Sequence, residues 1–122
     1  MTARRNDEER LQRAVVQLLT LVYPDLCWRA IPNGEYRSPR TAGRLKAMGV
    51  QAGVADLHIT IPYGGNTAWI ELKSAPGRQS PEQRAFEQSE RAAGARYQIC
   101  RSIDDVTRTL HEWGIRPIRK SV

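Results

Sequence analysis

Residues 56–73 have the sequence DLHITIPYGGNTAWIELK, and this stretch decides the fold. Apolar and polar residues alternate over 56–61 and again over 67–73, which predicts two β-strands because successive side chains on a strand point to opposite faces. The Pro-Tyr-Gly-Gly-Asn run at 62–66 is a strong turn signal. We therefore predict an antiparallel hairpin at the centre of the fold.

Matching the apolar faces of the two strands places Asp56, Glu71 and Lys73 on one common face. Asp56 and Glu71 could hold Mg²⁺, and the backbone carbonyl of Leu72 lies between the acid and the base. Lys73 could orient a water, stabilise transition-state charge or, with a lowered pKa, accept a proton. This set suits phosphodiester hydrolysis. The alternative is a cross-strand salt bridge on an exposed sheet face, which any one such pair favours.

The rest of the chain predicts helices around the hairpin and two further strands, in a mixed sheet of the α/β class. The N-terminal helix carries an apolar stripe at steps of three and four. That stripe consists of Leu11, Val15, Leu18, Leu19 and Val22. The predicted elements are a helix over 6–22, a strand over 26–31, a short helix over 41–48, a helix over 81–93, a strand over 95–100 and a final helix after 102–105.

Two helix starts carry recognisable signals. Ser80 and Gln83 form a capping box, in which Ser80 accepts from the third helical residue and Gln83 reaches back to the cap. Residues 7–9 are Asp-Glu-Glu, and we expect them in the first turn, where the helix dipole favours negative charge. The turn residues Gly49 and Gly53 bracket the approach to Asp56, and their small size would let a large substrate come close.

The charge balance points to a polyanionic partner. The 122 residues, enough for one domain over 1–122, include 19 basic and 13 acidic side chains, for a net charge of +6. The alternative is a basic surface that binds nothing. Candidate DNA contacts, each also explicable as solubilising charge, are Asn33, Arg37, Arg40, Arg44 and Lys46.

Cysteine usage and hydropathy suggest a reducing cytoplasm. Cys27 and Cys100 belong to no metal-binding array, and we predict both to be buried packing residues. The N-terminus lacks the apolar core of a signal peptide, and no stretch is long and apolar enough for a bilayer.

His58 shares the face of Asp56, where a structural role is favoured over a metal or phosphate contact. The three tryptophans are expected in the core or a dimer interface.

Several short motifs occur in one order along nearly the whole chain. They are Glu8-x-x-Leu11-Gln12, Pro32-Asn33-Gly34 with Arg37, residues 44–50, Gly53-Val54-Ala55-Asp56, Ile70-Glu71-Leu72-Lys73, and Ser80-Pro81-Glu82-Gln83 without the usual leucine. With these motifs the chain resembles a stand-alone VRR-NUC domain, a branch of the PD-(D/E)xK nuclease superfamily.

The resemblance implies a restriction-endonuclease-like fold and an endonuclease that depends on Mg²⁺, with Mn²⁺ able to substitute. Small stand-alone members resemble bacterial or viral homodimers that resolve four-way DNA junctions. Asp56, Glu71 and Lys73 carry over as the catalytic core. Glu8 carries over as a further acidic metal ligand, with Glu9 beside it leaving that assignment open.

Two further positions bear on the resemblance. Gln83 carries over as an active-site residue, although its capping role explains it equally well. Ala55 replaces the proline that usually precedes the acid, and this proline shapes the backbone and does no chemistry. We therefore expect an active enzyme.

Three functions stay open at this point. The first is a Holliday-junction resolvase-like homodimer acting on branched DNA. The second is a nickase or other endonuclease working with partner proteins. The third is a catalytically silent DNA-binding module.

Overall fold

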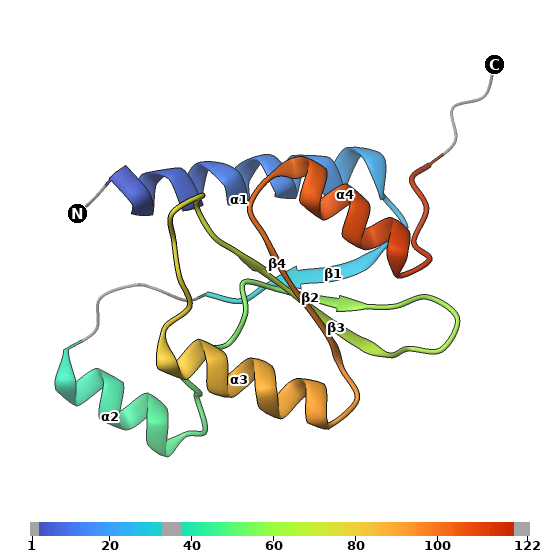
Figure 1. The fold of residues 1–122 in the computed structure, drawn as a ribbon. Coiled ribbons are helices and arrows are strands. Elements are labelled where there is room, and N and C mark those ends of the chain that lie inside the picture. The colour runs from blue at the N-terminus through green and yellow to red at the C-terminus, as the bar shows by residue number, and fades with distance from the viewer. Residues whose placement is uncertain (1–2, 33–37, 119–122) are drawn as a thin grey trace.

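A mixed β-sheet runs through the middle of the protein, with helices on both of its faces (Figure 1). The computed structural model describes residues 3–32 and 38–118. Its elements are α1 (Ala3–Val22), β1 (Cys27–Ala30), α2 (Pro39–Ala47), β2 (Leu57–Thr60), β3 (Thr67–Leu72), α3 (Pro81–Ala92), β4 (Arg96–Cys100) and α4 (Ile103–Glu112).

The predicted hairpin is confirmed as the centre of the sheet. The strand order is β1-β2-β3-β4, and β2 pairs with β3 antiparallel with Leu57 opposite Ile70. β1 joins β2 antiparallel, whereas β4 lies parallel to β3. A parallel partner needs a crossover connection, and α3 supplies it. The sheet is therefore mixed, as the sequence predicts.

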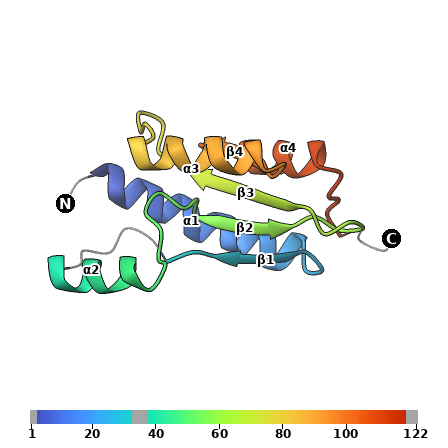
Figure 2. The ribbon, with the colours of Figure 1, turned by 90° about the horizontal axis from the view of Figure 1, so that it is seen from below.

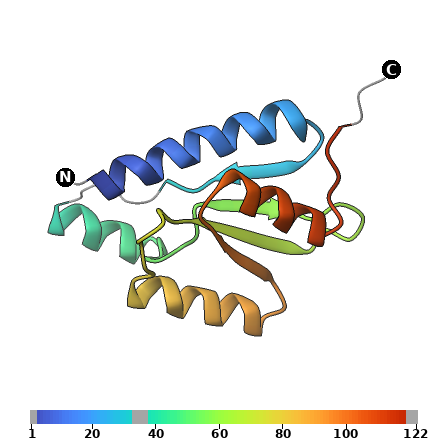
Figure 3. The same cartoon turned by 45° about the horizontal axis from the view of Figure 1, so that its top comes forward.

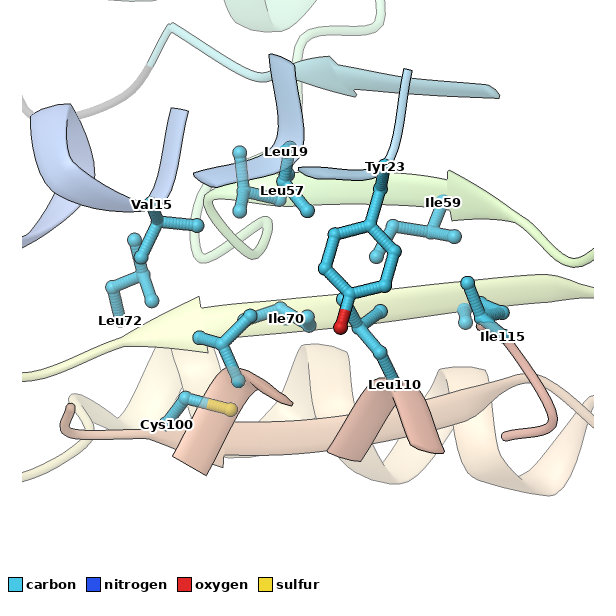
Figure 4. Close-up of a cluster of buried hydrophobic side chains, with 12 residues drawn as sticks. Val15, Leu19, Tyr23, Leu57, Ile59, Ile70, Leu72, Cys100, Leu110 and Ile115 are labelled. Atoms are coloured by element: carbon cyan, nitrogen blue, oxygen red, sulfur yellow. The ribbon is translucent and has the colours of Figure 1, made fainter. Parts of the chain in front are cut away.

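The larger core lies between the sheet and the pair α1 and α4. Figure 3 shows these two helices on one side of the strands and α3 on the other. Leu57, Ile59 and Ile70 point from β2 and β3 into the α1 side, where the predicted stripe of α1 meets them (Figure 4). A smaller cluster of Ala55, Phe86 and Tyr97 lies under α3. Both faces of the central strands are thus covered.

The helix boundaries differ from the predictions at two N-termini. α1 begins at Ala3, so the acidic run at 7–9 lies beyond the first turn and the predicted dipole contact is wrong. α2 begins at Pro39 because the Ser38 side chain accepts a hydrogen bond from Thr41 N at 3.2 Å, and proline suits the first helical turn. For α3 the capping box is confirmed, with both hydrogen bonds present.

The prediction that both cysteines are buried is half wrong. Cys100 is buried in the α1-side core, but Cys27 is exposed. Cys27 lies on edge strand β1, while the helix on that sheet face, α3, packs against β4 at the opposite edge. Among the described residues, α3 therefore does not cover Cys27 on this face of β1. Within the same residues, no helix is long and apolar enough to cross a membrane.

Candidate active site

The C-terminal end of β3 brings together the three charged residues singled out from the sequence. Asp56 precedes β2 and accepts a hydrogen bond from Leu72 N through Oδ2 at 2.7 Å. Glu71 has no exposed surface, and Lys73 retains 9%. The Lys73 Nζ atom lies 3.9 Å from Glu71 Oε2. The Glu71–Lys73 ion pair of the alternative interpretation is therefore present, but it joins two residues of the same chain segment and is buried, so the exposed cross-strand setting is wrong.

The two oxygens of Glu71 have different surroundings. Oε1 accepts hydrogen bonds from the Tyr97 hydroxyl and from Gln79 Nε2, the latter at 3.1 Å. Oε2 is buried and has no hydrogen-bond partner among the described residues, since Lys73 at 3.9 Å is beyond hydrogen-bond distance. Oε2 thus has an ion pair with Lys73 but no hydrogen bond, and a buried polar atom without a hydrogen bond calls for an explanation such as ligand binding or catalysis.

Helix α1 delivers a third carboxylate to the same end of the sheet. Glu8 Oε2 accepts from Ser74 N at 3.3 Å and from Ser74 Oγ at 3.4 Å, directly after Lys73. Glu9 is exposed and pairs with Arg13 at 3.5 Å. Of the two adjacent acids, Glu8 is therefore the one that faces the site.

The pKa of Asp56 is affected by its burial and by the charges around it. Burial raises the pKa of Asp56 to about 6, and the Leu72 N–H opposes this rise by stabilising the carboxylate. Glu71 and Glu8 add to the rise through charge repulsion, while Lys73 counters it. Three carboxylates and one lysine thus interact in one place, where a bound cation would relieve the repulsion.

The capping role expected as one alternative for Gln83 is confirmed, and a different glutamine contacts Glu71. Gln83 Oε1 accepts from Ser80 N at 2.8 Å within the capping box. Gln79 is the amide that contacts Glu71. Gln79 precedes the helix cap in a segment without periodicity, so no local pattern indicates its contact.

Arg101, also missed from sequence, holds the loop after β3 in place. Its Nη1 donates to Ser74 O at 2.7 Å and to Gly77 O at 2.8 Å. Gly77 itself lies against Glu8, since an added Cβ would stand 3.0 Å from Glu8 Oε2. The loop therefore links β4, α1 and the end of β3.

The loop before Asp56 packs against the start of α3. Gly53 has φ +82°, and a Cβ there would lie 2.4 Å from backbone atoms of Glu82. Its lack of a side chain allows close contact with the first turn of α3. This contact packs the entry to Asp56 against the helix that covers the site.

The predicted DNA contacts on α2 lie on an exposed helix. Arg40, Arg44 and Lys46 are all exposed, and none forms an ion pair with a described residue. Figures 1 and 2 show α2 at the same end of the molecule as the N-terminal part of α1 and the end of β3. Asn33 and Arg37 lie outside the described residues.

His58 does not contact the carboxylates. Its ring meets the Trp69 ring edge-on at 4.7 Å, and Nδ1 contacts Arg29 Nη1. Burial lowers the pKa of His58, and the positive charge of Arg29 lowers it further, against a smaller opposing effect of Glu90. These contacts agree with the structural role favoured from the sequence.

The donor set fits Mg²⁺ in its chemistry. All candidate ligands are oxygens, and Mg²⁺ binds through one or two carboxylates with waters completing its octahedron. Among the described residues, no group of three or more Asp, Glu, His or Cys side chains is placed to hold a metal ion. Glu71 Oε2, which has no hydrogen bond, and Asp56, with its raised pKa, are the two carboxylates that a cation could share.

Comparison with known proteins bears on the architecture. A solved structure described as a VRR_NUC domain protein superposes with a TM-score of 0.63, covering 87% of this chain and 86% of that chain at 24% identity. The chain has the fold of a VRR-NUC domain. The mixed sheet flanked by helices is the architecture that the sequence motifs imply. No protein-family model and no curated protein matches the sequence.

Proposed function

We propose that the protein is a divalent-metal-dependent endonuclease that cuts branched DNA, with a four-way junction as the favoured substrate. The observation that supports it most is the buried Glu71 carboxylate, one oxygen of which has no hydrogen bond, beside Asp56 and Lys73. The similarity in fold to a solved VRR_NUC domain protein adds to this support.

The side chains divide the work of phosphodiester hydrolysis. Mg²⁺, or Mn²⁺ in its place, would supply charge neutralisation and a more acidic water when bound. Asp56, Glu71 and the Leu72 carbonyl would hold it, with Glu8 contributing from α1. Lys73 is held near Glu71 with 9% exposure, where its ammonium can stabilise charge developing on the phosphate or orient the attacking water.

The charge of the protein and the symmetry of a dimer favour branched DNA as the substrate. The net charge of +6 and the exposed Arg40, Arg44 and Lys46 favour contacts with phosphates, which carry no sequence information. A homodimer with two-fold symmetry would place two sites on a junction of matching symmetry. DNA cleavage of this kind would take place in the cytoplasm of a bacterium. If the protein comes from a phage, it would act in the cytoplasm of the host cell.

The test is cleavage of junction, flap and linear duplex DNA of equal length, with and without Mg²⁺. Glu71→Gln and Lys73→Met should remove cleavage and retain junction binding, whereas the exposed Glu112→Gln should match the wild type. Mg²⁺-independent cutting, or wild-type rates in either site variant, contradicts the proposal. Binding without any cleavage would favour the silent DNA-binding module. Nicking that requires added partner proteins would favour the nickase that works with partners.

A further inference from the structure

The orientation of Glu71 is held by groups that come from outside the charged cluster. Tyr97 on β4 and Gln79 before α3 both donate to Oε1. Both donors occupy the same oxygen, so Oε2 is left on the side of Lys73. Free rotation of the carboxylate would break two hydrogen bonds in a buried environment, where each is costly to lose.

The two donors belong to a closed ring of hydrogen bonds. The other hydrogen of Gln79 Nε2 bonds Glu87 Oε1 at 2.9 Å. Arg91 pairs with Glu87 Oε2 at 2.7 Å and donates through Nη2 to Tyr97 O at 2.6 Å. The ring thus runs from Glu71 through Gln79, Glu87 and Arg91 to Tyr97 and back. Each member restricts its neighbours, so the amide of Gln79 has little freedom to turn.

Packing restricts the tyrosine in the same way. Tyr97 is buried with Phe86 and Ala55, and the Tyr97 and Phe86 rings lie 6.2 Å apart. The Arg91 guanidinium lies 5.9 Å from the centre of the Tyr97 ring. The hydroxyl therefore reaches Glu71 from a fixed position on the parallel strand.

We propose that Tyr97 and Gln79 are positioning residues, which hold Oε1 of Glu71 so that Oε2 alone is presented to a divalent cation. This inference rests on the proposed function, since it assigns Glu71 to a metal. Groups that orient a ligand from behind are known to affect metal affinity or activity by about 10- to 100-fold. Their role is to reduce the reorganisation needed when the cation binds.

Calorimetric titration with Mn²⁺ alone tests the proposal without relying on turnover. Tyr97→Phe keeps the ring and removes only the hydroxyl, and Gln79→Met keeps the length and removes the amide. Each should weaken Mn²⁺ binding by about tenfold. On junction DNA each should lower kcat and leave KM unchanged, because neither residue is proposed to contact DNA. Unfolding in urea verifies that the variants are folded.

Matched controls separate positioning from a general loss of packing. Tyr23→Phe removes the hydroxyl of a buried tyrosine in the α1-side core, and Gln98→Met changes an exposed glutamine on β4; both should bind Mn²⁺ like the wild type. If Tyr97→Phe and Gln79→Met also bind within twofold of the wild type, the positioning role is refuted and the proposed function survives. If the wild type itself binds no Mn²⁺, with or without DNA, the proposed function fails and the inference fails with it.

Discussion

The substitution Asp56→Asn should make the metal-free protein more stable at neutral pH while removing its activity. Asp56 is held among Glu71, Glu8 and Lys73 in a largely buried position, and its pKa is raised from 3.8 to about 6 by that burial above all. Asparagine retains an oxygen that can accept from Leu72 N. It removes the carboxylate charge that burial penalises.

The magnitude follows from the shift of about two pKa units. One unit corresponds to about 1.4 kcal/mol, so ionised Asp56 lowers the free energy of unfolding by about 3 kcal/mol. The pKa in the folded protein lies above that of the unfolded chain. The stabilising effect of protonation is therefore complete below about pH 3.8 and is lost as the pH rises through about 6. Asp56→Asn should gain up to about 3 kcal/mol at pH 7.5 and almost nothing near pH 3.5.

Urea unfolding of both proteins across this pH range, in EDTA, measures the difference. Asp105→Asn is a control of opposite sign, because a hydrogen bond from Arg101 N, the largest cause, and the Arg108 charge lower the pKa of Asp105. That variant should lose stability at neutral pH and recover it in acid. A stability gain for Asp56→Asn that does not change with pH, or a loss at pH 7.5, would refute the electrostatic reasoning.

Two further substitutions test how the site is assembled. Gly53→Ala should lower the free energy of unfolding by several kcal/mol, because its Cβ would meet backbone atoms at 2.4 Å. Gly49→Ala is the control: Gly49 has φ +94° but no atom within 4 Å of an added Cβ, so the free energy of unfolding should fall by only about 1 kcal/mol. Equal losses in urea unfolding would contradict the packing role. Arg101→Met should cost about 1–3 kcal/mol by releasing carbonyls of the 74–77 loop, and faster hydrogen exchange in that loop is the confirming measurement.

Local patterns in the sequence were sufficient for the hairpin and for the face it presents. Apolar and polar residues alternate along both strands with a period of two, so shifting the pairing by one residue would bury the polar set. Only one register matches the two apolar faces, and it places Asp56 and Glu71 on the same face. The Ser80 cap is local in the same sense, because both of its hydrogen bonds span three residues. The charged cluster was therefore predictable as a set.

Only the tertiary structure decided how that cluster is enclosed and oriented. The contact between Glu8 and Ser74 joins residues 66 positions apart, and that between Tyr97 and Glu71 joins residues 26 apart, so neither leaves a periodic signal. Burial of Glu71 depends on α3 covering one sheet edge, and exposure of Cys27 depends on the same helix not reaching the other. Alternation specifies which side chains share a face, but the packing of distant elements determines whether that face is buried and which oxygen of Glu71 has no hydrogen bond.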